Sequence, residues 1–121
     1  MAHSFKQLKI WNLAMDIVVD VYKITAELPK EEKFGLTSQI KRAAISMPSN
    51  IAEGAGRGSD KEFCHFLKIA LGSVFELETQ LLLSERLNIV GSELSDIYLK
   101  INELEKMIIG FINKLSLKSN I

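Results

Sequence analysis

Three residues of the sequence could do chemistry, and their spacing decides what kind. Glu62 and His65 have the Glu-x-x-His spacing that supplies part of a di-iron site in helical bundles. A complete site needs a second such pair and two more glutamates, and the only other histidine is His3. Cys64 adjoins His65, but neighbours on a helix point about 100° apart, so they form no nucleophile–base pair. We therefore predict no catalytic residue, no metal site and no cofactor.

A glycine-rich segment offers a second kind of chemistry, phosphate binding. Gly54-Ala55-Gly56-Arg57-Gly58-Ser59 leads into the start of a predicted helix, where backbone N–H groups can hold an anion. The segment lacks the lysine of a P-loop, and no strand precedes it. A glycine-terminated helix followed by a tight turn is the simpler interpretation. The alternative is a backbone nest for one RNA phosphate, helped by Arg57 and Lys61.

The charged residues limit how nucleic acid could be bound. Lys and Arg number 15, Asp and Glu also number 15, and the pI is about 6.7, so any contact must come from a local patch. The basic residues that could form such a patch are Lys41, Arg42, Arg57, Lys61 and Lys68. A charge-balanced surface without a binding role is the competing interpretation.

The helix that carries Arg42 also has a polar stripe with mostly three- and four-residue spacing. Its members are Gln39, Arg42, Ser46, Ser49, Asn50, Glu53 and Arg57. Such a stripe is typical of a solvated helix face. It is also compatible with a polar network or a ligand-facing surface, because amides and hydroxyls are costly to bury without partners.

These residues must be positioned by helices, because apolar side chains recur at helical spacing along the whole chain. The pattern predicts helices over about residues 6–28, 34–55, 60–88 and 93–115, the third capped by Ser59 and the fourth by Ser92. The first has a second apolar strip and should pack on two sides. Gly72 and Gly110 inside helices indicate close helix approach, above all between the second and third helices.

Length and composition fit one domain. The chain has 121 residues and 13.6 kDa, with 47% hydrophobic and 25% charged residues and a single cysteine. We predict an all-α, antiparallel up-down-up-down four-helix bundle over residues 1–121. No apolar run approaches membrane-spanning length and no signal-peptide core follows the N-terminus, so we expect no membrane contact and a cytoplasmic location.

Several short segments along the chain together form a distinctive pattern. The most specific of them is Ser46-x-Pro48-x-Asn50-Ile51-Ala52-Glu53-Gly54. The other segments are Phe5-Lys6-Gln7-Leu8, Ile10-Trp11, residues 34–45, Gly56-Arg57, Phe63-x-x-Phe66-Leu67 and residues 69–79. Over about residues 5–115 the chain thereby resembles the bacterial four-helix-bundle proteins encoded in intervening sequences of 23S ribosomal RNA genes.

The resemblance has implications for assembly and partners. The family is similar in fold to the accessory variability proteins of diversity-generating retroelements, which form homopentamers, bind nucleic acid through basic surfaces and bind a reverse transcriptase. A homopentamer is therefore implied, with a structured RNA as one candidate partner. The alternative is a scaffold or adaptor for a protein such as a polymerase or reverse transcriptase. No enzymatic activity is implied.

Overall fold

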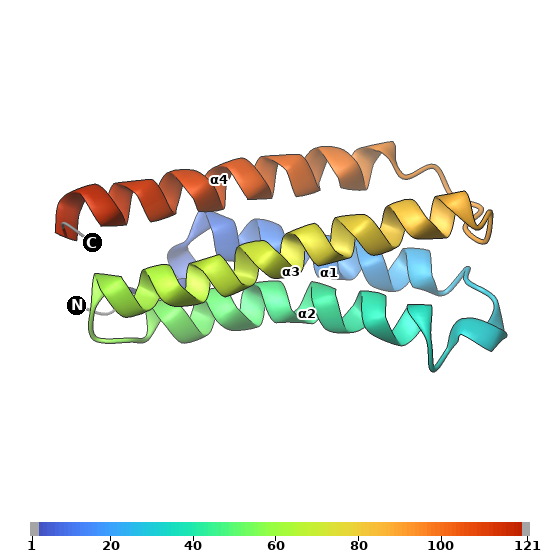
Figure 1. The fold of residues 1–121 in the computed structure, drawn as a ribbon, viewed down its shortest axis with the longest axis horizontal. Coiled ribbons are helices and arrows are strands. Elements are labelled where there is room, and N and C mark those ends of the chain that lie inside the picture. Colours follow the sequence, from blue (N-terminus) through green and yellow to red (C-terminus); the bar gives the residue numbers. More distant parts are fainter. Residues whose placement is uncertain (1–2, 120–121) are drawn as a thin grey trace.

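The computed structural model describes residues 3–119 and consists of four α-helices joined by short connections (Figure 1). The helices are α1 (Lys9–Thr25), α2 (Leu36–Ala55), α3 (Asp60–Arg86) and α4 (Ser95–Ser119). Two short 3-10 helices, η1 (Phe5–Gln7) and η2 (Lys30–Glu32), precede α1 and α2. The part of the chain that the structure describes contains no strand, and the predicted all-α fold is confirmed.

Helices that follow one another in the chain run antiparallel and pack side by side, and α1 also packs against α4 (Figure 1). This is the predicted up-down-up-down bundle. The first and last described residues therefore lie at the same end, together with the turn between α2 and α3. A backbone hydrogen bond of 2.7 Å from His3 N to Ala55 O ties the start of the chain to that turn.

A single apolar core runs through all four helices, and the predicted spacing identifies most of it. Along α3 the buried positions step by three and four residues, and along α4 they do the same. The core side chains of these two helices include Phe63, Leu67, Ala70, Val74, Leu77 and Leu81, and Ile97, Ile101, Leu104 and Ile108, joined by Leu94 just before α4. Each buried aliphatic or aromatic side chain contributes about 1.5–3 kcal/mol, so this core is what holds the helices together.

The close contact between α2 and α3 lies at a glycine other than the two that we predicted. A Cβ on Gly54 would lie 2.7 Å from Phe66 Cβ and 3.0 Å from Phe63 Cδ1, so only glycine lets the backbones approach here. A Cβ on Gly72 or Gly110 would meet nothing within 4 Å. The tight α2–α3 packing is confirmed, whereas the roles assigned to Gly72 and Gly110 were wrong.

The helix ends confirm one predicted cap and correct another. Ser59 caps α3, its Oγ accepting a hydrogen bond of 3.2 Å from the Glu62 backbone N–H. Ser92 does not cap α4, which begins three residues later; its hydroxyl donates instead to the carboxylate of Glu27, in the turn that follows α1. The first free N–H of α4, at Ser95, donates to Glu93 Oε1 at 2.8 Å. Ser92 thus links the connection between α3 and α4 to the turn after α1, and it does not start a helix.

No helix among the described residues is long and apolar enough to cross a lipid bilayer.

Candidate functional site

The five predicted basic residues lie in three different places. Lys41 and Arg42 are in the first half of α2, whereas Arg57 follows the end of that helix. At 1.5 Å per residue, the helix separates Lys41 from Ala55 by about 20 Å. Lys61 and Lys68 are on α3, within its first three turns. Arg57, Lys61 and Lys68 therefore share one end of the bundle, and the other two do not belong to the same patch.

Arg57 and Lys41 each already have a partner in the chain. The Arg57 guanidinium lies 4.8 Å from the centre of the Phe66 ring and 3.0 Å from a Glu53 carboxylate oxygen. Glu53 and Arg57 thus form an ion pair between residues four apart at the end of α2. Lys41 Nζ lies 4.7 Å from the centre of the Tyr22 ring on α1. Both side chains are exposed or half-buried, so these contacts orient their charges without removing them from solvent.

The lysines of α3 line a groove between α3 and α4. Lys61, His65 and Lys68 are spaced by four and then three residues, which places them on one face of the helix. Together with Cys64 and Ser116 they line a groove of about 320 Å³. His65 and Ser116 were absent from the predicted site, although the lysine–histidine–lysine spacing was visible in the sequence. Ser116 could not be assigned to it, because its place depends on how α4 is aligned with α3.

The thiol of Cys64 forms the buried side of this groove. Cys64 is only 4% exposed, and its Sγ lies 3.8 Å from Ile112 O and 3.9 Å from Ser116 Oγ. These are contacts of a weak S–H donor in a helix–helix interface. The sulfur therefore packs α3 against α4, while the charged side chains above it remain exposed.

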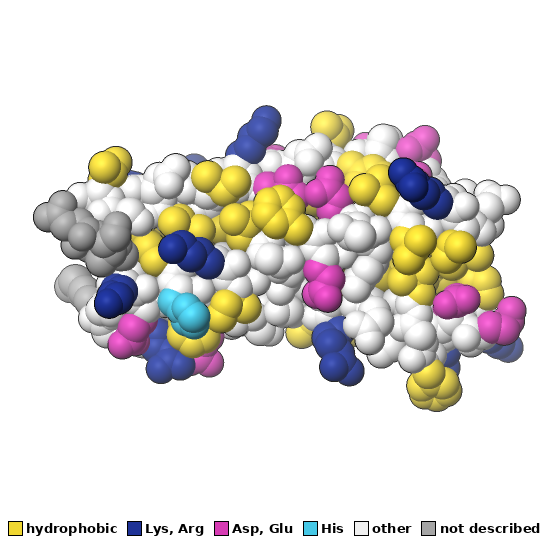
Figure 2. All heavy atoms as spheres, in the orientation of Figure 1, with side chains coloured by type: hydrophobic (Ala, Val, Ile, Leu, Met, Phe, Trp, Pro, Cys, Tyr) yellow, Lys and Arg dark blue, Asp and Glu magenta, His cyan; other side chains and the backbone are white. Residues whose placement is uncertain are grey.

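Charge is unevenly divided along the bundle. The half around the turn between α2 and α3 comprises residues 3–12, 47–72 and 108–118, and we call it the basic half. It holds seven Lys and Arg against three Asp and Glu, whereas the rest of the chain, which we call the acidic half, holds eight against twelve. Figure 2 shows basic side chains around a histidine near one end of the molecule. A net charge of zero thus conceals a positive end and a negative end.

The polar stripe of α2 divides into a half-buried part, which faces α3, and an exposed part. Ser46 Oγ and Ser73 Oγ of α3 are 2.8 Å apart, and Asn50 Nδ2 donates to Ser46 Oγ at 2.9 Å. Ser73 also donates to Ile69 O at 3.3 Å. These groups form the polar network that was one of the two interpretations of the stripe. The remaining members of the stripe are exposed and fit the other interpretation, a solvated helix face. They are Gln39, Arg42, Ser49, Glu53 and Arg57.

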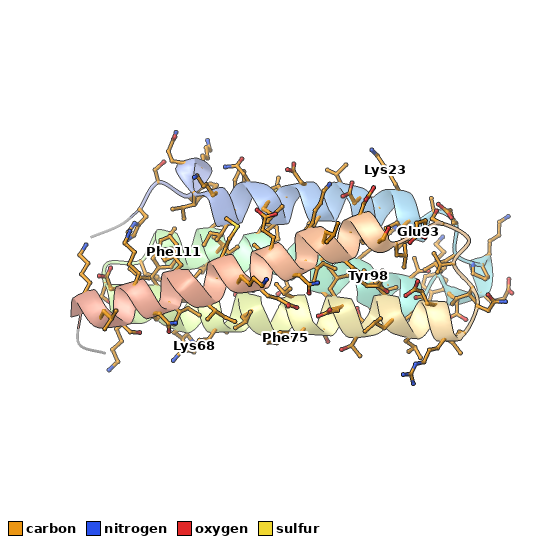
Figure 3. The ribbon with its side chains drawn as sticks, turned by 90° about the horizontal axis from the view of Figure 1, so that it is seen from above. Lys23, Lys68, Phe75, Glu93, Tyr98 and Phe111 are labelled. Atoms are coloured by element: carbon orange, nitrogen blue, oxygen red, sulfur yellow. The ribbon has the colours of Figure 1, made fainter. Side chains whose placement is uncertain are left out.

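Carboxyl groups meet in the acidic part of the α3–α4 interface. Burial, and then a hydrogen bond with the Glu78 carboxyl group, raise the pKa of Glu105 to about 7. Two carboxylates cannot share a hydrogen bond unless one is protonated. Glu105 Oε2 is also buried without a hydrogen-bond partner among the described residues, which favours the neutral form of the group. Tyr98, which lies toward α3 in Figure 3, donates to Glu85 at 2.6 Å. Burial and this carboxylate raise its pKa above the ordinary tyrosine value.

Glu62 and His65 have a spacing typical of metal ligands, but the described part of the chain adds no further ligand to them. Within the described residues, no group of three or more His, Cys, Asp or Glu side chains is arranged to hold a metal ion. His65 instead contacts the edge of the Phe66 ring, with 5.4 Å between ring centres.

Comparison with known proteins identifies the family. No individual curated protein is similar enough to be aligned with the chain. A profile of the family described as 23S rRNA-intervening sequence protein matches residues 6–110, which include all of α1, α2 and α3 and more than half of α4. The four-helix fold agrees with the expectation from resemblance. The chain belongs to the 23S rRNA-intervening sequence protein family.

Proposed function

We propose that this protein binds RNA through the basic half of the bundle. The observation that carries the proposal is the uneven charge, with Lys and Arg outnumbering Asp and Glu around the turn between α2 and α3. A positive surface attracts the phosphate backbone and releases counterions on binding. The family is described as 23S rRNA-intervening sequence protein, and this association with a ribosomal RNA sequence is compatible with an RNA partner.

Within the basic half, Lys61 and Lys68 are the central contacts. Both ammonium groups are exposed, and neither is within ion-pair distance of an Asp or Glu side chain among the described residues. Arg57 is at the edge, where Glu53 offsets part of its charge and its guanidinium lies over the Phe66 ring. Lys41 and Arg42 are too distant to contact the same phosphate and would contact a different part of a longer RNA.

Salt dependence of binding tests this proposal. A double variant, Lys61→Ala with Lys68→Ala, should bind a structured ribosomal RNA insert more weakly and lower the slope of log K against log salt by about 1.5. The matched control, Lys30→Ala with Lys106→Ala, removes the same charge from exposed positions outside the basic half. Equal losses of affinity and slope in both double variants would disprove the assignment of the site to Lys61 and Lys68.

A second function, protein scaffolding, is favoured by the outer surface of α1. Met15, Val19 and Tyr22 are spaced by four and three residues and are 41%, 54% and 44% exposed. Beside them, residues of α1 and α2 that include Trp11, Met15 and Ile45 line a largely apolar groove of about 300 Å³. Apolar side chains gathered in this way mark an interaction surface. We propose that copies of this chain associate through it.

The number of copies that we propose is five, and this number rests on resemblance. Native mass spectrometry should give five times the chain mass of 13.6 kDa. A monomer at micromolar concentration would disprove the assembly. For the adaptor alternative, a polymerase or reverse transcriptase should still be captured from the natural host after nuclease treatment, whereas loss of the partner with the RNA would support direct RNA binding.

A further inference from the structure

We propose that the groove between α3 and α4 is a phosphate-binding pocket that receives one phosphate group of the RNA. We call it the α3–α4 pocket; its lining residues are Lys61, Cys64, His65, Lys68 and Ser116. The proposal rests on the proposed RNA-binding function and deepens it, because it assigns the contact to a defined concave site. It also predicts that inorganic phosphate alone is bound there.

The arrangement of donors around the α3–α4 pocket suits a phosphate. Lys61 and Lys68 supply two ammonium groups about two turns apart on α3, with the imidazole of His65 on the turn between them. Ser116 of α4 supplies a hydroxyl from the opposite wall. A phosphate presents acceptor oxygens in several directions, so donors from two helices can bind it at once.

The charge around the pocket excludes a cationic ligand. None of the residues that line it is Asp or Glu. A groove of similar volume, about 270 Å³, lies between α1 and α4 in the acidic half and is lined by two lysines and by four carboxylates, those of Asp20, Glu27, Glu93 and Asp96. The two grooves differ in charge and not in size, so the chemistry of their ligands should also differ.

Size and depth restrict the ligand further. A volume of about 320 Å³ holds a phosphate with its ribose but not a base-paired duplex. The floor is the buried Cys64 thiol, whose neighbour is the Ile112 carbonyl group. Lys61 lies in the first turn of α3, where the positive end of the helix dipole adds to the attraction for an anion.

Histidine signals give a direct test with the full-length chain. The protein has two histidines, of which His65 lines the pocket, while His3 lies against Phe63 and Asp60. The signals are NMR resonances of the protein with isotopically labelled histidine. Adding inorganic phosphate at constant pH and ionic strength should shift the His65 imidazole resonances until the site is saturated. The double variant Lys61→Ala with Lys68→Ala should weaken this binding at least tenfold, whereas Lys30→Ala with Lys106→Ala should leave it unchanged.

A His65 signal that moves no more with phosphate than with chloride of equal ionic strength would disprove phosphate binding in the pocket. Identical phosphate affinity in the double variant of Lys61 and Lys68 and in that of Lys30 and Lys106 would also disprove it. Ser116→Leu fills the pocket without changing charge and should also abolish the shift. If that variant does not fold, as checked by circular dichroism, the lysine variants alone decide the question.

Two oligoribonucleotides distinguish the possible sources of the phosphate. If an oligonucleotide with a 5′-phosphate competes with inorganic phosphate and its 5′-hydroxyl counterpart does not, the pocket takes a terminal phosphate; equal competition shows that it takes internal ones. Structured RNA that binds tightly without moving His65 would overturn the pocket and leave the RNA-binding function intact. Phosphate binding without any RNA binding would disprove the proposed RNA-binding function, but the α3–α4 pocket would still be a phosphate-binding site.

Discussion

Gly54 and Gly72 show how one residue type has opposite roles in two helices. Gly54 is buried where α2 meets α3, and a Cβ there would lie 2.7 Å from Phe66 Cβ. Gly72 is exposed in the middle of α3, with nothing within 4 Å of where its Cβ would be. Because Phe66 Cβ is fixed to the backbone, the first clash cannot be relieved by rotating a side chain.

This contrast predicts stability changes of opposite sign. Gly54→Ala should lower the free energy of unfolding by about 1–3 kcal/mol through overpacking. Gly72→Ala should raise it by up to about 1 kcal/mol, because alanine is the better helix former. Urea unfolding of both variants measures the two values. A neutral Gly54→Ala would mean that α2 and α3 are not packed as closely as the structure has them.

The carboxyl pair of Glu105 and Glu78 makes stability depend on pH. The folded-state pKa of Glu105, about 7, is above the unfolded value of about 4.3, so the folded protein binds the proton more tightly between these values. The free energy of unfolding should therefore fall as pH rises from about 4.5 to 7. Above pH 7 the destabilisation is complete.

Glu105→Gln tests this origin of the pH dependence, because the amide stays neutral and can still donate to Glu78. At pH 8 the variant should be more stable than the wild type by about 1 kcal/mol, after allowance for solvent screening. At pH 5 the difference should be small or absent. A stability difference that does not change between pH 5 and pH 8 would refute the role of this proton.

At the scale of elements, helical periodicity predicts which residues lie in the core but not how helices are aligned. The buried positions of α3 and α4 follow from three- and four-residue spacing, since burial on one face is a local property of a helix. The pairing of Ser46 with Ser73, and of Ser116 with the lysines of α3, depends on the alignment of separate helices. For the same reason the sequence grouped Lys41 with Lys61, although about 20 Å of α2 separates Lys41 from the turn that leads to α3.

The apolar strip on α1 carries a prediction for assembly. Met15→Lys with Val19→Lys should convert the oligomer to smaller species, because charges would be buried in the proposed interface. Leu99→Lys is the control, since Leu99 is 69% exposed on α4. Native mass spectrometry should show dissociation in the first variant only. An oligomer that withstands the α1 substitutions would place the interface on another face.

At the scale of the whole molecule, the direction of the helices separates the charge. Up-down-up-down topology brings the start of α1, the turn between α2 and α3, and the end of α4 to one end (Figure 1). Basic residues that are far apart in the sequence, such as Lys9, Lys61 and Lys118, thereby share one half of the bundle. A structured RNA should accordingly approach this half and not the acidic one.

Lysine footprinting tests that claim most directly, since mass spectrometry reads the acetylation rate of each lysine separately. A structured ribosomal RNA insert should slow acetylation of Lys61 and Lys68 severalfold and leave Lys30 and Lys106 unchanged, at a salt concentration where binding is saturated. Equal protection of all four lysines, or protection of Lys30 and Lys106 alone, would contradict RNA binding by the basic half.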